Sequence, residues 1–262
     1  MTRIAHKATR FTRAVLSLLA ALGLMAGTAA LPASAAPSTR YVALGDSIAA
    51  GTGGGAFLNA CLQTASSYPA LLGASANEAC FGATTADVVA TQVPGLPPTV
   101  RSVTITVGAN DVGDVQVAVA CTTDPTSLAC QQALYDAVFV LLPQLPAKVT
   151  ATIAAVRSRA PGAQITLTGY PLLFTVSGLP ASEQPIAAEI NTATALLNST
   201  IGGTALVNSV HFADVTSKFL GHGLGSSDPW INPFTPGDPG SFHPTATGYG
   251  EGYVPVVAPL LH

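Results

Sequence analysis

The stretch that decides the fold is Tyr41-Val42-Ala43-Leu44-Gly45-Asp46-Ser47, a short apolar run that leads directly into a glycine turn. Such a run, followed at once by glycine, predicts a buried strand that ends at a sheet edge. The turn would present the Ser47 hydroxyl there, with backbone N–H groups nearby. A serine hydroxyl becomes a good nucleophile only when a base takes its proton. The alternative interpretation is a loop turn capped by the Asp46 side chain. Other segments of the sequence are needed to choose between a catalytic turn and a plain one.

Further strands and helices alternate along the chain and indicate the fold class. Expected strands cover 102–107, 164–168 and 205–210, and expected helices cover 66–72, 85–91, 131–160 and about 182–200. This alternation predicts a mostly parallel sheet covered on both faces, as in a single-domain, three-layer α/β/α sandwich. In such sheets the site forms beyond the carboxyl ends of the strands.

Two segments carry groups that could stabilise a developing negative charge. Gly108-Ala109-Asn110-Asp111 follows the second strand, where the Asn110 amide could donate a hydrogen bond to an oxyanion. Gly82 precedes an expected helix start, so its backbone N–H could approach a substrate oxygen. The alternatives are plain turn formers after a strand and an ordinary helix start capped by Thr84 or Thr85.

The base should be a histidine, and His243 is the best candidate. It stands in Ser241-Phe242-His243-Pro244, after a loop rich in proline and glycine. A proline at the first position of a helix leaves the preceding residue at the cap. The other candidates follow an apolar strand, lie in a glycine-flanked loop, or end the chain; they are His211, His222 and His262.

The first 36 residues resemble an export signal. Four cations precede an uncharged apolar run from 14 to 31, and a small-x-small cleavage site follows at Ala33-Ser34-Ala35. A retained membrane anchor is the alternative. Residues 37–262 then form one domain, with six cations and thirteen acids and a net charge of −7. This charge argues against nucleic acid or anionic membranes as partners. No later stretch looks long and apolar enough for an integral membrane span.

Four cysteines in an exported chain predict two disulfides, for which three pairings exist. We favour Cys61–Cys80 and Cys121–Cys130, because both close short loops, each contributing about 3 kcal/mol in the chain-entropy model. A metal site is the alternative, but it needs ligands at tighter spacing.

In this order, the Gly-Asp-Ser, Gly, Gly-x-Asn-Asp and His-Pro blocks resemble the SGNH (GDSL) hydrolase family, and most closely its secreted actinobacterial lipases and esterases. The resemblance covers nearly all of the chain after the signal. It implies a flavodoxin-like sheet, Ser47 as nucleophile, and an oxyanion hole made by the N–H groups of Ser47 and Gly82 and the side chain of Asn110. Close relatives commonly have a third disulfide, for which this chain has no cysteines.

The chain departs from the family pattern three residues before the histidine, where most members have an aspartate. Here the position is Gly240. Either a backbone carbonyl, of Gly240 or Ser241, orients the imidazole of His243, or Asp238 does so. We favour the carbonyl, because Pro239 and Gly240 separate Asp238 from the histidine.

The resemblance predicts a carboxylic-ester hydrolase, a lipase, esterase or phospholipase, that needs no metal or organic cofactor. The substrate would be a small-molecule or lipid ester, and the enzyme would be a secreted monomer. Phe57 and Leu58 are candidates for lining an acyl pocket, although plain loop packing explains them as well. The alternatives are a carbohydrate acetyl esterase and, from another class, an inactive secreted binding protein.

Overall fold

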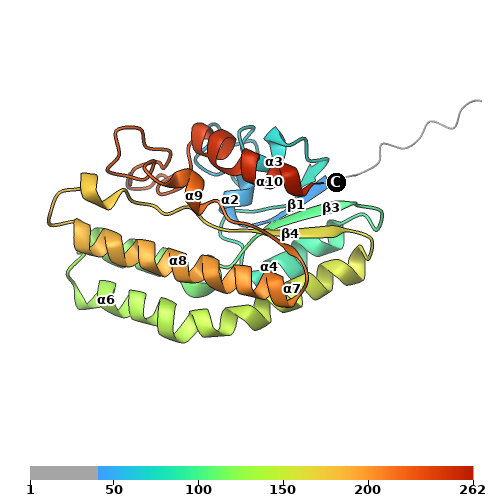
Figure 1. Ribbon diagram of the computed structural model, residues 1–262, viewed down its shortest axis with the longest axis horizontal. Helices are drawn as coiled ribbons and strands as arrows, with labels where there is room; N and C mark the ends of the chain where they lie inside the picture. Colours follow the sequence, from blue (N-terminus) through green and yellow to red (C-terminus); the bar gives the residue numbers. More distant parts are fainter. Residues whose placement is uncertain (1–40, 262) are drawn as a thin grey trace, which may run out of the picture. The chain divides into compact units, whose positions relative to one another are not determined.

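The computed structural model describes residues 41–261 and contains one parallel sheet of five strands (Figure 1). The spatial order is β2-β1-β3-β4-β5, which is the order of flavodoxin-like sheets. The predicted export signal and His262 lie outside the described residues. The strands are β1 (Tyr41–Gly45), β2 (Ala76–Asn77), β3 (Ser102–Thr106), β4 (Gln164–Thr168) and β5 (His211–Ala213).

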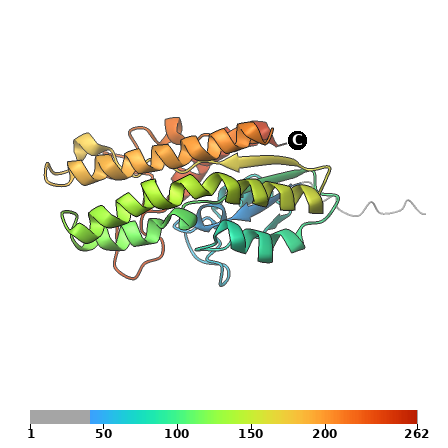
Figure 2. The same ribbon diagram turned by 90° about the horizontal axis from the view of Figure 1, so that it is seen from below.

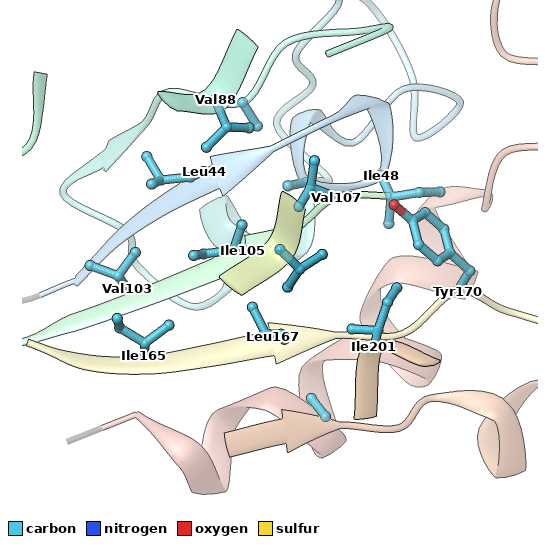
Figure 3. Close-up of a cluster of buried hydrophobic side chains, with 14 of the residues drawn as sticks. Leu44, Ile48, Val88, Val103, Ile105, Val107, Ile165, Leu167, Tyr170 and Ile201 are labelled. Atoms are coloured by element: carbon cyan, nitrogen blue, oxygen red, sulfur yellow. The ribbon is translucent and has the colours of Figure 1, made fainter. Parts of the chain in front are cut away.

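The central strands β1 and β3 are buried along their whole length. They pair in register from Tyr41 opposite Ser102 to Gly45 opposite Thr106. Apolar side chains of β1, β3 and β4 meet those of the covering helices, and Figure 3 shows Leu44, Ile105 and Leu167 in this core. A strand buried on both faces explains why the sequence of β1 is a continuous apolar run rather than an alternating one.

Helices cover both faces of the sheet, so the predicted three-layer sandwich is confirmed (Figures 1 and 2). The short helices α3 (Tyr68–Leu71), α9 (Thr216–Phe219) and α10 (Val254–Val257) lie on one side. On the other side are α4 (Thr85–Asp87), α7 (Leu145–Arg159) and α8 (Gln184–Val207). Helix α2 (Ser47–Ala50) starts directly beyond β1.

The expected strand at 205–210 is wrong. Helix α8 continues through Gly202 and Gly203 to Val207, and the strand that follows is β5, at His211–Ala213. Ile201 and Ala205 are 1% exposed on the side of α8 that packs into the core. This packing outweighs the strand preference of β-branched residues. Ser209, at a positive φ of 52°, reverses the chain between the two elements.

A continuous helical stretch runs from Leu128 to Arg159 and includes Pro143 and Pro146. It joins α6 (Leu128–Tyr135) to α7 through a π-helical turn at Asp136–Leu141 and a 3₁₀ turn at Leu142–Gln144. By length and composition this stretch, alone among the described helices, could cross a membrane, and a single helix of this kind is weak evidence for a span. Core helices of water-exposed proteins pass the same test, and α7 buries one side in the core.

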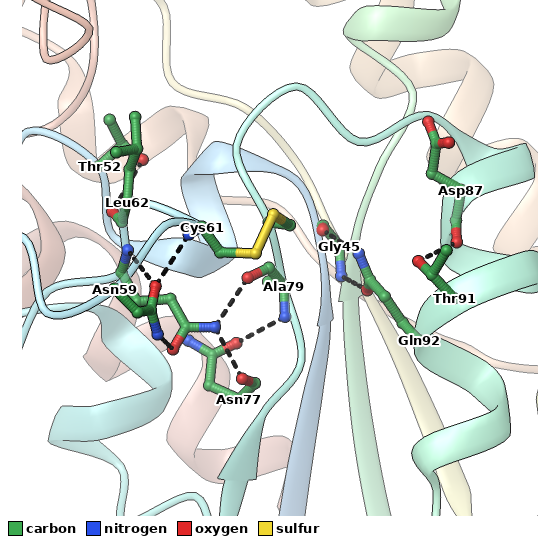
Figure 4. The surroundings of a disulfide bond; sticks show 12 residues. Gly45, Thr52, Asn59, Cys61, Leu62, Asn77, Ala79, Asp87, Thr91 and Gln92 are labelled. Carbon is green, nitrogen blue, oxygen red and sulfur yellow. Dashed lines mark hydrogen bonds between the residues drawn. A yellow bond between two sulfur atoms is a disulfide. The ribbon is translucent and has the colours of Figure 1, made fainter.

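The two disulfides are those favoured from the sequence. Cys61 is bonded to Cys80 (Figure 4), and Cys121 is bonded to Cys130. The second bond links α5 (Asp114–Thr123) to α6, so that these two helices form a hairpin. That hairpin and the N-terminal part of α8 extend past the sheet in Figures 1 and 2.

Candidate active site

The turn that carries Ser47 is held at the carboxyl end of β1. Gly45 has a φ of 133°, and a Cβ there would lie 2.1 Å from the carbonyl oxygen of Thr106. The Gln92 side chain accepts from Gly45 N–H at 2.7 Å and donates to the Gly45 carbonyl at 2.8 Å (Figure 4). Asp46 then caps α2 by accepting from Ile48 N–H at 3.0 Å. Only glycine fits this close approach of two strands, which is why the apolar run ends there.

His243 lies on a segment that is fastened to the loop after Ser47. The Asn232 amide donates to the carbonyl of Gly53 at 3.0 Å and to that of His243 at 3.1 Å. A Cβ on Gly53 would lie 2.8 Å from the Cβ of His243, so the two loops are in close contact. Phe242 adopts a positive φ of 62° immediately before the histidine. These contacts hold the segment of His243 against the loop that follows Ser47, although the two are distant in the sequence.

The result is a short contact between the predicted nucleophile and base. His243 Nε2 lies 2.7 Å from Ser47 Oγ, and Nδ1 lies 2.9 Å from the carbonyl oxygen of Ser241. Because a carbonyl only accepts, Nδ1 must carry the proton of the neutral ring. Nε2 is then free to accept the serine proton, which is the tautomer that a general base requires.

The groups considered for orienting His243 differ in their contacts. The Ser241 carbonyl contacts the ring, whereas the Gly240 carbonyl accepts the backbone N–H of His243 at 3.1 Å. The Asp238 carboxylate accepts from Gly240 N–H at 2.8 Å. Asp238 therefore acts on the imidazole only through its charge, at longer range.

Burial lowers the pKa of His243 below its ordinary 6.5, while the Ser241 carbonyl and the charge of Asp238 oppose this shift. The Phe81 ring contributes to the burial, with its centroid 5.9 Å from that of the imidazole. His243 is therefore neutral at pH 7, the form in which it accepts a proton.

The resemblance predicts an oxyanion hole made of three hydrogen-bond donors, and the structure shows which contacts each donor makes. Among the residues described, the backbone N–H groups of Ser47 and Gly82 meet no acceptor. The Asn110 amide donates one N–H to the carbonyl of Ala83 at 3.0 Å, which fixes the side chain and leaves its other N–H available. Donors held in place before the reaction are what an oxyanion requires.

Asp111 is a supporting residue whose role the sequence did not reveal. Its carboxylate accepts from Thr85 N–H at 2.8 Å and from the Thr85 hydroxyl at 2.7 Å, and it lies 3.5 Å from Lys148 Nζ. It thus joins the strand end that carries Asn110 to the start of α4, just after Gly82. The only sequence feature that pointed to this role is that Asp111 directly follows Asn110.

Tyr170, at the end of β4, joins the nucleophile turn to the Asn110 turn. Its hydroxyl donates to the Asp46 carboxylate at 2.5 Å and accepts from Ala109 N–H at 3.1 Å. Asp46 is 1% exposed, and burial raises its pKa to about 7 although both hydrogen bonds it accepts act in the opposite direction. The tyrosine supplies the donor that this buried carboxyl needs.

Other sequence candidates lie apart from this centre. The His222 ring stacks on Trp230 with centroids 3.7 Å apart, and His211 is exposed on β5. Phe57 and Leu58 are 43% and 66% exposed. No group of three or more acidic, histidine or cysteine side chains within 41–261 is arranged to hold a metal ion.

The fold and these groups define the class of α/β serine hydrolases that act at the carboxyl edge of a parallel sheet. The sequence matches the GDSL-like lipase/acylhydrolase family over residues 43–250, and the chain belongs to that family. It is 36% identical to a lipase of Streptomyces rimosus, with 94% of this chain and 96% of the relative covered.

Two solved structures have the same architecture. The extracellular lipase of Streptomyces rimosus superposes with a TM-score of 0.80 at 34% identity, and phospholipase A1 of Streptomyces albidoflavus NA297 with 0.80 at 31%. Each comparison covers 85% of this chain and 99% of the other. The protein is accordingly a carboxylic-ester hydrolase of the GDSL lipase/esterase type with a small-molecule ester as substrate.

Proposed function

We propose that Ser47 and His243 form a catalytic dyad that hydrolyses carboxylic esters through an acyl-enzyme. The observation that carries the proposal is the chain of contacts from Ser47 Oγ through the imidazole to the Ser241 carbonyl, at 2.7 and 2.9 Å. The carbonyl fixes the tautomer and accepts a stronger hydrogen bond when the ring becomes positive, which is the task of a carboxylate in most serine hydrolases.

In the first half-reaction His243 Nε2 takes the proton of Ser47, and the serine oxygen bonds to the acyl carbon. The negative charge on the former carbonyl oxygen is stabilised by the N–H groups of Ser47 and Gly82 and by the Asn110 amide. The bond from the acyl carbon to the alcohol oxygen then breaks, and His243 returns the proton to the leaving alcohol.

In the second half-reaction water replaces the alcohol. His243 takes one proton from the water, whose oxygen attacks the acyl carbon of the enzyme ester. The bond to Ser47 Oγ breaks, the serine recovers its proton from His243, and the carboxylic acid leaves. The two steps consume one ester and one water and yield one alcohol and one acid.

The setting of the enzyme is also part of the proposal. Residues 1–36 act as a secretory signal, and residues 37–262 act outside the cell as a monomeric hydrolase domain on lipid esters. The basic, apolar and small-residue segments of the N-terminus support secretion, as does the extracellular lipase among the similar structures.

The test is hydrolysis of p-nitrophenyl esters by the protein and by Ser47→Ala, with Ser199→Ala on an exposed site of α8 as the matched control. We expect Ser47→Ala to lose activity by about a thousandfold or more and the control to keep it. A folded Ser47→Ala variant with near-full activity would overturn the assignment. Turnover of acetate esters alone would favour the acetyl esterase, and a protein inert toward every ester would be a binding protein.

A further inference from the structure

A buried tyrosine at the end of β4 connects the two turns that carry the proposed catalytic groups. Tyr170 is 6% exposed, and its ring extends from the end of β4 toward Ile48 in Figure 3. Its hydroxyl donates to the Asp46 carboxylate at 2.5 Å and accepts from the backbone N–H of Ala109 at 3.1 Å. A single oxygen atom thus joins the turn after β1 to the turn after β3.

The sheet itself does not hold these two turns together. The pairing of β1 with β3 ends where Gly45 lies opposite Thr106. Within the described chain, no backbone hydrogen bond joins segment 47–52 to segment 107–112. The Tyr170 hydroxyl therefore provides the connection at the point where strand pairing has stopped.

The tyrosine is in turn fixed by a side chain of α8. The Asn198 amide accepts from the backbone N–H of Tyr170 at 2.8 Å and donates to its carbonyl at 2.8 Å. Asn198 is 5% exposed and also donates to the Thr216 hydroxyl at 3.2 Å. Burial and the charge of Asp46 raise the pKa of Tyr170 above its ordinary 10, so the hydroxyl keeps the proton that it donates.

Both partners of the hydroxyl are buried, so its loss would leave two polar groups without a partner. Asp46 is 1% exposed, and the charges of Asp114 and Asp111 act against its ionised form. Ala109 is 8% exposed, and its N–H donates to Tyr170. Buried polar groups rarely stay unpaired, so the two turns would shift to find other partners.

We propose that Tyr170 is a positioning residue, which holds the Ser47 hydroxyl and the Asn110 amide at the separation that the tetrahedral intermediate requires. Asp46 directly precedes Ser47, and Ala109 directly precedes Asn110. The inference rests on the proposed function of Ser47. A misplaced oxyanion donor weakens binding of the transition state more than binding of the substrate, so the loss falls on kcat rather than on KM.

The first test compares Tyr170→Phe with Tyr41→Phe in hydrolysis of p-nitrophenyl butyrate. Tyr41 is also 6% exposed, but its hydroxyl lies 2.9 Å from that of Thr104 and contacts neither turn. We expect Tyr170→Phe to lower kcat about tenfold or more with KM within about threefold, and Tyr41→Phe to keep kcat within about twofold. Equal kcat values in the two folded variants, or a rise in KM alone, overturn the inference.

The second test separates positioning from loss of stability. Butylboronic acid bonds to an active serine as a tetrahedral adduct, so its inhibition constant reports on the oxyanion donors. We expect this constant to rise about tenfold in Tyr170→Phe and to stay unchanged in Tyr41→Phe, and equal constants overturn the inference. If Tyr170→Phe does not fold, Asp46→Asn replaces it, because a neutral amide weakens the bond to the tyrosine. An unchanged kcat in Asp46→Asn then overturns the inference.

Ser47→Ala, assayed in parallel, distinguishes the two proposals. Near-full activity of folded Ser47→Ala overturns the proposed function, and the positioning role of Tyr170 with it. Loss of activity in Ser47→Ala, together with equal kcat values for Tyr170→Phe and Tyr41→Phe, overturns the positioning role alone.

Discussion

His243 is oriented by a neutral carbonyl, and this choice of partner has measurable effects. Ser241 offers a lone pair 2.9 Å from Nδ1, while Asp238 is engaged with Gly240. A carbonyl fixes the tautomer as a carboxylate does, but it adds no full negative charge beside the ring. The positive form of the imidazole is stabilised by this dipole and, at longer range, by the charge of Asp238.

We expect Asp238→Asn to keep kcat within about threefold of the unchanged protein, because its carboxylate does not contact the imidazole. The measurement is steady-state hydrolysis of p-nitrophenyl butyrate. Asp228→Asn, an acidic residue contacting His222 instead, serves as the control. A fall of several orders of magnitude in a folded Asp238→Asn variant would show that Asp238 completes a triad.

The pH dependence follows from the lowered pKa of His243. A depressed folded pKa means that the neutral base persists at pH 6.5 and is lost only at lower pH, so the acid limb of kcat/KM should lie below 6.5. The free energy of unfolding should change in the same direction. As pH falls below 6.5, the unfolded chain binds the proton more readily than the buried ring does, so the folded state loses stability. The measurement is a kcat/KM profile from pH 4 to 9, and an acid limb above pH 7 contradicts the prediction.

The candidate site residues could be proposed from the sequence because each stands in a short local motif. Ser47, Asn110 and His243 follow strand ends or open a helix, and their order along the chain carried the resemblance. The bond from Tyr170 to Asp46 joins residues 124 positions apart. No local pattern encodes such a contact, because it depends on the order of strands in the sheet.

At the level of elements, the strands β1, β3 and β4 were predictable because buried parallel strands are rich in apolar or β-branched residues, as these three are. Segment 205–210 has similar composition but is mostly the end of α8 and a turn. Gly202 and Gly203 look like a signal that ends the helix. In the structure the helix continues, and Gly202 lets the Phe212 ring pack closely because glycine has no side chain. Composition alone does not distinguish a helix end from a buried strand of this length.

The stability of the α5–α6 hairpin should depend on the Cys121–Cys130 disulfide more than the stability of the sheet does. We expect the double variant Cys121→Ser/Cys130→Ser to lose about 2–3 kcal/mol of unfolding free energy, the chain-entropy value for a short loop.

The measurement is guanidinium unfolding, with Cys61→Ser/Cys80→Ser as the matched comparison. That variant should lose similar stability, because its disulfide also closes a short loop. An unchanged free energy of unfolding in the hairpin variant would contradict the prediction.

For the whole molecule, the distribution of charge determines which lipid surfaces we expect it to approach. Between Arg101 and Lys148 the chain has no lysine or arginine, and this interval holds the α5–α6 hairpin. Exposed apolar side chains are found there, including Val119 at 63% and Phe139 at 66%. Such a region favours uncharged or zwitterionic surfaces over anionic ones.

We expect Ser47→Ala to sediment more with phosphatidylcholine vesicles than with phosphatidylglycerol vesicles at low salt. Because residues 37–262 carry a net charge of −7, added salt should reduce the difference by screening repulsion. The same measurement on Ser47→Ala that also carries Phe139→Ser tests how much this exposed apolar side chain contributes to vesicle binding. Tighter binding to phosphatidylglycerol would contradict the prediction.

The proposed dyad joins residues 196 positions apart, and its serine turn is held to β3 by the hydrogen bond from Asp46 N–H to the Thr106 carbonyl. Ribosomes add residues in order, so a growing polypeptide possesses the nucleophile long before it possesses the base. On the proposed mechanism, Ser47 is activated only after His243 has been added and its loop has packed against Gly53. The proposed hydrolase therefore has no activity during most of its own synthesis.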